Sequence, residues 1–203
     1  MPSILIIDYG LGNLRSVQKA LTQLGADVLI SNQQRKLDDF DALVIPGVGA
    51  FRDGMENVLP LKEAIHHQIT AGKPLLGICL GMQLLFTESS EGGFFKGLNF
   101  LPGKVIHFPQ ELKVPHMGWN SLEILDSTNP LISTLSTGQY VYFVHSYYAQ
   151  VSNMTNVIAQ TKYGVTFPSI IAADNVFATQ FHPEKSGKVG LTILQNFIQY
   201  IKR

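Results

Sequence analysis

The chain has 203 residues, 15 Lys and Arg against 15 Asp and Glu, and a single cysteine, so its formal net charge is zero and an internal disulfide is excluded. A chain of this length buries a core without cross-links, and the absence of Lys and Arg runs argues against nucleic acid or an anionic membrane as the main partner. The charged fraction of 15% is below the roughly 25% of ordinary soluble domains, which indicates a surface of uncharged polar side chains or one that faces another protein.

The N-terminal residues predict a buried strand and no targeting segment. The apolar run at residues 4–7 stops at Asp8, which makes it too short for the core of a signal peptide. The longest apolar stretch, residues 74–86, is interrupted by Gly77, Gly81 and Gln83 and is shorter than the roughly 20 residues of a membrane helix. We therefore expect a cytosolic protein with no membrane span.

Apolar runs and helical patterns alternate in the first half of the chain, which is typical of βα units in a mainly parallel sheet. The expected strands are residues 4–7, 28–30, 42–45 and 75–78. The expected helices are one that Asn13 caps and Gly25 ends, one through Leu61, Ile65 and Ile69, and one that begins at Leu80.

Beyond residue 100, short runs separated by Asn, Ser, Gly and Pro predict further strands. They are residues 104–108, 121–125, 140–144, 147–151, 157–161, 170–173 and 176–181, before a last helix at 191–201. No repeat or composition break divides the chain. We expect one α/β domain over residues 1–203, with an open, mainly parallel sheet flanked by helices and an antiparallel extension.

Gly77-Ile78-Cys79-Leu80-Gly81 follows a predicted strand and opens a predicted helix. This is the pattern of a nucleophile elbow, with a thiol in place of the serine hydroxyl. Such a turn strains its central residue, glycines beside it avoid clashes, and a helix N-terminus favours the thiolate. A buried, inert cysteine in a tight turn is the alternative, because free cysteine is often buried.

A candidate base lies in Phe181-His182-Pro183-Glu184, directly after the last predicted strand. His182 beside a thiol can accept its proton and later deliver it to a leaving amine, while Glu184 can hold the imidazole in one tautomer. The position suits a site, because open α/β sheets bind ligands outside the carboxyl ends of their strands.

The segment Pro46-Gly47-Val48-Gly49-Ala50-Phe51 also follows a predicted strand. Its glycines let the backbone turn N–H groups toward a reacting centre. The amides of Val48 or Gly49, together with that of Leu80, can form an oxyanion hole, although a plain turn explains the segment equally well by itself.

Together these segments resemble the class I, triad-type glutamine amidotransferases, which implies a flavodoxin-like α/β fold. The resemblance covers essentially the whole chain and is carried by residues 8–13, 46–51, 77–86, 115–120, 142–147 and 181–185. The elbow and His-Pro-Glu are shared across the family. Pro-Gly-Val-Gly and Pro-His-Met-Gly-Trp-Asn point to members that dock on a (βα)8-barrel synthase subunit.

The resemblance implies that glutamine is hydrolysed to glutamate and ammonia without a cofactor or a metal. Cys79 would attack the side-chain amide, His182 would protonate the departing ammonia and then activate water, and Glu184 would orient His182. The residues implied to position glutamine are Gln83, Glu91, Ser146 and Tyr147. Ser146 stands where relatives often carry threonine.

The resemblance also implies a heterodimer in which ammonia passes to the barrel subunit, which joins it to a phosphorylated ribulosyl carboxamide nucleotide. The residues implied at this interface are Asn13, His116, Met117, Gly118, Trp119, Asn120 and Lys185. From residue type alone, Trp119 is expected in the core. We expect its segment to be a loop that opens a strand.

Two alternatives stay open. The glutaminase subunit of pyridoxal phosphate synthase also docks on a barrel, but it expects a Gly-Gly-Glu-Ser type of loop where this chain has Gly47-Val48-Gly49. A non-enzymatic α/β redox sensor or chaperone with an elbow cysteine would lack the His-Pro-Glu segment. Release of glutamate from glutamine by the purified chain distinguishes an enzyme from a sensor.

Overall fold

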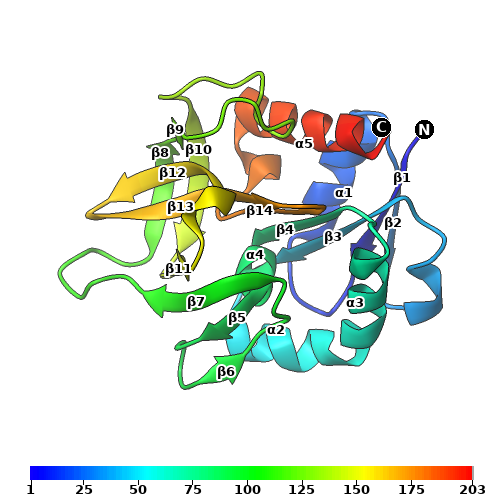
Figure 1. Cartoon of the computed structure of the whole chain (residues 1–203), viewed down its shortest axis with the longest axis horizontal. Helices are drawn as coiled ribbons and strands as arrows, with labels where there is room; N and C mark the ends of the chain where they lie inside the picture. Colours follow the sequence, from blue (N-terminus) through cyan, green and yellow to red (C-terminus); the bar gives the residue numbers. More distant parts are fainter. Residues whose placement is uncertain (203) are drawn as a thin grey trace.

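A computed structural model describes residues 1–202, and its centre is an eight-stranded sheet (Figure 1). In spatial order the strands are β2 (Asp27–Ser31), β1 (Ser3–Ile7), β3 (Ala42–Gly47), β4 (Leu75–Cys79), β14 (Val176–Thr179), β13 (Val165–Ala173), β12 (Val157–Tyr163) and β9 (Glu123–Ile124). The strands from β2 to β14 pair in parallel, and β13, β12 and β9 continue the sheet in antiparallel pairing. The predicted mainly parallel sheet with an antiparallel extension is therefore confirmed.

Helices cover both faces of this sheet (Figure 1). Helices α1 (Leu14–Gln23) and α5 (Gly187–Ile201) pack on one face, and α2 (Phe51–Val58) and α3 (Lys62–Thr70) pack on the other. Along β1, Ile4 and Ile6 join one core while Leu5 and Ile7 join the other, because side chains alternate across a strand. Burial on both faces explains why this strand is a continuous apolar run.

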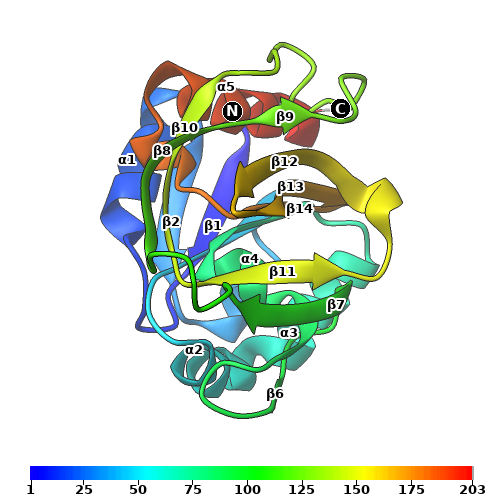
Figure 2. The same ribbon diagram turned by 90° about the vertical axis from the view of Figure 1, so that its left-hand side faces the viewer.

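Two smaller sheets lie beside the main one. Strand β8 (His116–Ser121) pairs with β10 (Tyr140–His145), and the second sheet has the order β11 (Tyr147–Val151), β7 (Leu101–His107), β5 (Phe86–Ser89) and β6 (Phe95–Lys96). Figure 2 shows β8 and β10 as a curved ribbon that runs from the level of α5 toward β11. Because β10 and β11 are separated by Ser146 alone, this ribbon connects directly to the second sheet.

Several predicted elements need correction. Residues 115–120, expected as a loop, are largely strand β8, and only Glu123–Ile124 of the strand expected at 121–125 forms β9. Helix α2 and strands β5 and β6 were not predicted, and α5 begins at Gly187, four residues before the expected start. Strand β14 ends at Thr179, which leaves the His-Pro-Glu segment in the connection to α5.

Asn13 occupies the N-cap position of α1, but within residues 1–202 its side chain caps no backbone amide. Its backbone angles of φ −89° and ψ 56° differ from the extended conformation that aims an N-cap side chain at the first turn. The Asn13 side-chain oxygen instead accepts a hydrogen bond from the Ser16 hydroxyl at 2.9 Å.

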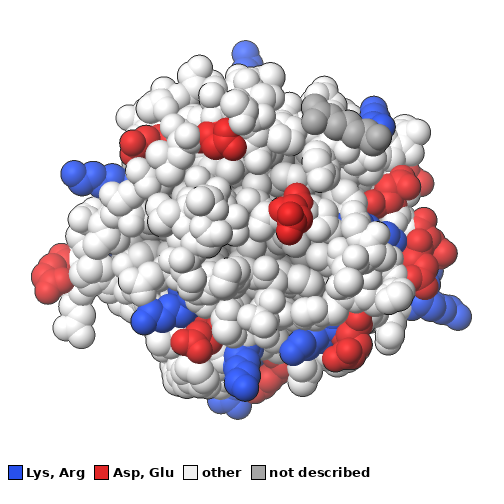
Figure 3. All heavy atoms as spheres, viewed as in Figure 1, with Lys and Arg blue, Asp and Glu red and all other residues white. Residues whose placement is uncertain are grey.

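The surface carries few charges. Figure 3 shows acidic and basic side chains mainly around the rim of one face, with wide uncharged areas between them. Among the helices of residues 1–202, none is both long and apolar enough to cross a membrane.

Candidate active site

Cys79 stands at the turn between β4 and the short helix α4 (Leu80–Leu84), with φ 55° and ψ −108°. A non-glycine residue at positive φ is strained. A Cβ atom at Gly81 would lie 1.7 Å from the Ile45 carbonyl oxygen, and one at Gly77 would lie 2.9 Å from the Gly81 carbonyl oxygen. Only glycine fits on either side of the thiol, so the backbone has the geometry that the elbow pattern predicts.

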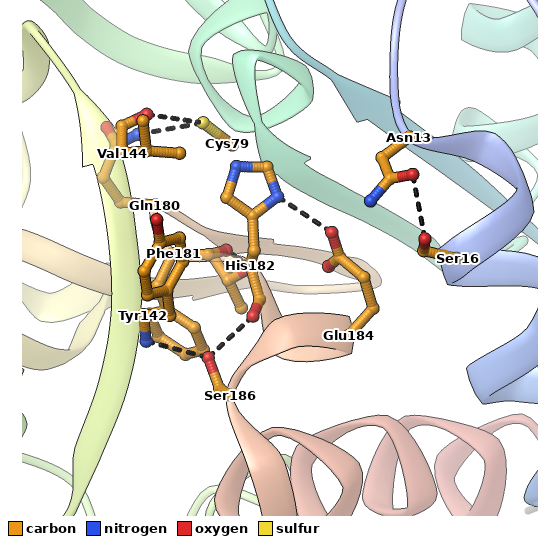
Figure 4. Close-up of polar contacts among 11 residues, drawn as sticks. Asn13, Ser16, Cys79, Tyr142, Val144, Gln180, Phe181, His182, Glu184 and Ser186 are labelled. Carbon is orange, nitrogen blue, oxygen red and sulfur yellow. Dashed lines mark hydrogen bonds and ion pairs between the residues drawn. The ribbon is translucent and has the colours of Figure 1, made fainter. Parts of the chain in front are cut away.

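His182 lies between β14 and the 3₁₀ turn η4 (Pro183–Lys185), and its backbone is clamped to β10. The His182 amide donates to the Tyr142 carbonyl at 3.0 Å. The Ser186 hydroxyl donates to the His182 carbonyl at 2.6 Å and accepts the Tyr142 amide at 3.0 Å (Figure 4). These three bonds fix the point from which the imidazole projects.

The side chains of His182 and Glu184 form a buried pair. The distance from His182 Nδ1 to Glu184 Oε1 is 2.9 Å, and the two side chains are 2% and 0% exposed. The opposite edge of the imidazole faces the sulfur of Cys79 (Figure 4). Within residues 1–202, His182 Nε2 has no hydrogen-bond partner besides the neighbouring thiol, so this nitrogen is placed to exchange a proton with Cys79.

Charges around His182 favour its protonated form. Burial alone would lower the pKa of this imidazole, but contact with Cys79 and with the Glu184 carboxylate outweighs burial and raises the pKa to about 9. Cys79 and Glu184 therefore both favour the imidazolium form of His182.

A cleft of about 300 Å³ opens beside Cys79. It is lined by Val48, Gly49, Cys79, Leu80, Gln83, Glu91, Pro115, Val144, His145, Ser146 and Tyr147. All four residues expected to position glutamine are in this lining, and so are the three expected to form the oxyanion hole. The carboxyl ends of β3 and β4, helix α4, the connection after β5 and the junction of β10 with β11 bring them together.

The amide side chain of Gln83 is already engaged in the wall of the cleft. Its nitrogen donates to the Tyr147 carbonyl at 2.9 Å and to Gln180 Oε1 at 3.2 Å. The Gln180 side-chain nitrogen lies 3.9 Å from the Cys79 sulfur, and the Val144 carbonyl lies 3.8 Å from the same sulfur. The sequence analysis did not single out Gln180, although a polar residue within the strand expected at 176–181, two positions before His182, is a usable signal.

Glu91 joins the cleft to helix α2. One of its carboxylate oxygens accepts the amide of Phe51, the first residue of that helix, at 2.9 Å. Burial raises the pKa of the Glu91 carboxyl, and the bond to the Phe51 amide partly offsets this.

The segment expected at a partner interface alternates between surface and interior. Met117 and Trp119 of β8 are 66% and 56% exposed, whereas His116 on the same strand is only 4% exposed. The core position expected for Trp119 from residue type is therefore wrong, and His116 offers little surface to a partner. Lys185 is exposed, and Asn13, Gly118 and Asn120 are partly buried.

His116 belongs instead to a chain of hydrogen bonds that ends at the cleft. His145 Nδ1 donates to the Tyr147 carbonyl at 2.8 Å, since that oxygen can only accept. His145 Nε2 then accepts from His116 Nδ1 at 3.0 Å, and His116 Nε2 accepts from the Asn120 amide at 3.3 Å. Within residues 1–202, no group of three or more His, Cys, Asp or Glu side chains is placed to hold a metal ion.

Comparison with known proteins connects this geometry to a family. Residues 5–200 match the family described as glutamine amidotransferase class-I. The chain is 50% identical over 205 residues to imidazole glycerol phosphate synthase subunit HisH of Halobacterium salinarum, covering 98% of this chain and 93% of that protein. It is also 50% identical over 199 residues to the protein of that name from Methanothermobacter thermautotrophicus, covering 98% of this chain and 99% of the relative.

Solved structures support the fold. A putative GMP synthase protein from Thermoplasma acidophilum aligns with a TM-score of 0.77 and 22% identity, over 100% of this chain and 94% of that one. PurLQS from Thermotoga maritima aligns with a TM-score of 0.79 and 19% identity, over 98% of both chains. At these identities the likeness concerns the fold alone.

Proposed function

Because the chain belongs to the class I glutamine amidotransferase family and, within it, to the family of imidazole glycerol phosphate synthase subunit HisH, we propose that it supplies ammonia from glutamine through a Cys79-His182-Glu184 triad. The observation that carries the triad is the buried His182–Glu184 pair at 2.9 Å, whose free imidazole edge faces Cys79 (Figure 4). The same membership disfavours the redox-sensor and pyridoxal phosphate synthase alternatives.

In the first half of the reaction, the Cys79 thiolate attacks the δ-carbonyl carbon of glutamine and a C–S bond forms. The carbonyl oxygen becomes an oxyanion, which the amides of the Val48–Gly49 segment and Leu80 stabilise. The C–N bond then breaks, the His182 imidazolium gives its proton to the departing ammonia, and a glutamyl thioester remains on Cys79.

In the second half, the neutral His182 takes a proton from water, and the hydroxide attacks the thioester carbon. The C–S bond breaks, glutamate leaves, and Cys79 and His182 return to thiolate and imidazolium. Glu184 keeps the imidazole in the tautomer whose Nε2 faces the thiol throughout. Gln83, Glu91, Ser146 and Tyr147 hold the rest of glutamine in the cleft.

The ammonia passes to a (βα)8-barrel synthase subunit in a heterodimer. That subunit uses it to form imidazole glycerol phosphate and aminoimidazole carboxamide ribotide in histidine biosynthesis. The exposed apolar side chains of Met117 and Trp119, on a strand adjacent to the cleft, support a protein partner on this side.

Cys79→Ala in the reconstituted complex tests this division of labour. We expect synthesis from glutamine to fall by at least about 1000-fold, as when a nucleophile is removed, and synthesis from added ammonia to stay within twofold of wild type. Thermal unfolding of the variant checks that it folds. Loss of both activities in a folded variant would refute the separation of hydrolysis from synthesis, and retention of glutamine-dependent synthesis would refute Cys79 as nucleophile.

A further inference from the structure

Tyr9 follows β1 and is 5% exposed, yet no step of the proposed reaction uses it. Its hydroxyl donates a hydrogen bond of 2.6 Å to the carbonyl of Pro46. Burial, and to a smaller extent the charge of Cys79, raise the pKa of Tyr9, so the hydroxyl keeps its proton and remains a donor. Pro46 begins the segment from 46 to 51, here called the oxyanion loop, which runs from the last two residues of β3 to the first residue of α2.

The start of the oxyanion loop is tightly packed around this bond. A Cβ atom at Gly47 would lie 2.2 Å from the Tyr9 hydroxyl oxygen and 2.8 Å from the Leu80 Cβ. A Cβ atom at Gly12 would lie 3.2 Å from the Pro46 carbonyl oxygen. Tyr9 therefore occupies the space beside both the loop and Leu80, whose amide is the other proposed oxyanion donor.

The far end of the oxyanion loop is held as well. Phe51 is fully buried, and its amide donates to the Glu91 carboxylate at 2.9 Å. Phe51 also begins helix α2, so this bond sets where the loop ends and the helix starts.

The middle of the loop is open by contrast. Val48 is 40% exposed, and Gly49 has φ +111°. A Cβ atom at Gly49 would meet only Leu11 Cδ2, at 4.0 Å. Both ends of the loop are therefore held by hydrogen bonds, whereas Val48 and Gly49 between them have few neighbours.

We propose that Tyr9 is a positioning residue for the oxyanion hole. Its hydroxyl fixes the Pro46 end of the oxyanion loop, while Glu91 fixes the Phe51 end. The Val48 and Gly49 amides are thereby presented, beside the Leu80 amide, to the oxygen on the carbon that Cys79 attacks. This proposal rests on the proposed function, because it takes the loop as part of the oxyanion hole. Tyr9 does not line the glutamine cleft among the described residues, so its effect is on the transition state and not on substrate binding.

Tyr9→Phe in the reconstituted complex keeps the ring and removes only the hydroxyl. We expect kcat for glutamine hydrolysis to fall about tenfold, less than the 100- to 1000-fold that follows loss of a whole donor, and KM to stay within twofold. The rate at which iodoacetamide alkylates Cys79 should stay within twofold of wild type, because that displacement forms no oxyanion. Thermal unfolding shows whether the variant is folded at the assay temperature.

Tyr163→Phe is the matched control. The Tyr163 hydroxyl donates to the Lys113 carbonyl at 2.7 Å, so this variant loses the same kind of bond away from the oxyanion loop and should keep the wild-type kcat.

Three results would overturn the proposal: an unchanged kcat in Tyr9→Phe, a raised KM with kcat unchanged, or equal losses of hydrolysis and alkylation, which would mean that Tyr9 acts on the thiol. A wild-type complex that releases no glutamate would refute the proposed function itself.

Discussion

His182 is an imidazole that stays charged although it is buried. Burial favours the neutral ring, but the Cys79 and Glu184 side chains raise its pKa from the ordinary 6.5 to about 9. Because the pKa in the folded protein is above that in the unfolded chain, the stabilisation is complete below pH 6.5 and is lost as pH rises through about 9. In the proposed reaction this is the proton that passes to the departing ammonia, and it is lost over the same interval.

We expect kcat for glutamine hydrolysis to fall as pH rises through about 9. In Glu184→Gln this decline of kcat should begin at a lower pH. The variant removes one of the two groups that raise the pKa of His182. Steady-state kcat at saturating glutamine, measured from pH 6 upward in both proteins, checks this. If kcat declined at the same pH in both proteins, another group, such as the amino group of glutamine, would control the decline.

At the scale of the elements, β8 and β10 share a buried polar connection. Both histidines of the pair His116–His145 are neutral, because burial lowers their pKa values to about 4 and about 3. Neutral rings are required by the hydrogen bonds, since His145 Nε2 must accept from His116 Nδ1. A proton on either ring leaves two donors facing each other inside the fold.

The folded pKa values of these histidines lie below the ordinary value of 6.5, so the unfolded chain binds protons first as pH falls. We expect the free energy of unfolding to decrease from pH 6.5 to pH 5. The slope is about 1.4 kcal/mol per pH unit for each histidine that is protonated in the unfolded chain and neutral in the folded protein. Urea denaturation of His145→Gln should give a shallower slope, while His67→Gln, at an exposed histidine, keeps the wild-type slope. Equal slopes in wild type and His145→Gln would contradict the assignment.

The elements that could be predicted are those in which the order of apolar and polar residues matches which side chains are buried. Strands β1, β3 and β4 are continuous apolar runs because helices cover both faces. Strand β8 was missed because Met117, Gly118 and Trp119 carry no β-branched pattern, and its inward residue is a histidine. Helix α2 was missed because it contains Gly54, a poor helix former, at a position where a Cβ atom would lie close to Leu84 Cδ2, at 3.1 Å.

The site shows the same division. The proximity of Cys79, His182 and Glu184 could be predicted because their motifs stand at or shortly after the carboxyl ends of β4 and β14, which are neighbours in the sheet. The role of Tyr9 could not, because a hydrogen bond across 37 positions to Pro46 exists only once β1 and β3 pair side by side. Register between distant segments is the information that local patterns lack.

For the whole molecule, the low charge density and the apolar side chains of β8 lead to one expectation about assembly. Trp119 is 56% exposed, and its ring centroid lies 6.0 Å from that of Tyr142. The Tyr142 carbonyl in turn accepts a hydrogen bond from the His182 amide. An exposed tryptophan beside a site is a typical interface anchor, worth about 2 kcal/mol or more when buried by a partner.

We therefore expect Trp119→Ala to weaken binding to the proposed barrel subunit about 30-fold, the equivalent of about 2 kcal/mol. The thermal midpoint of the isolated chain should change little, because an exposed side chain contributes little to the core. Titration calorimetry with the purified barrel subunit measures the affinity. Met154→Ala, which truncates another exposed apolar side chain (58%) in the turn η3 (Met154–Asn156), should leave it unchanged. An unaltered affinity in Trp119→Ala would move the interface away from β8, and a lost cooperative unfolding transition would return Trp119 to the core.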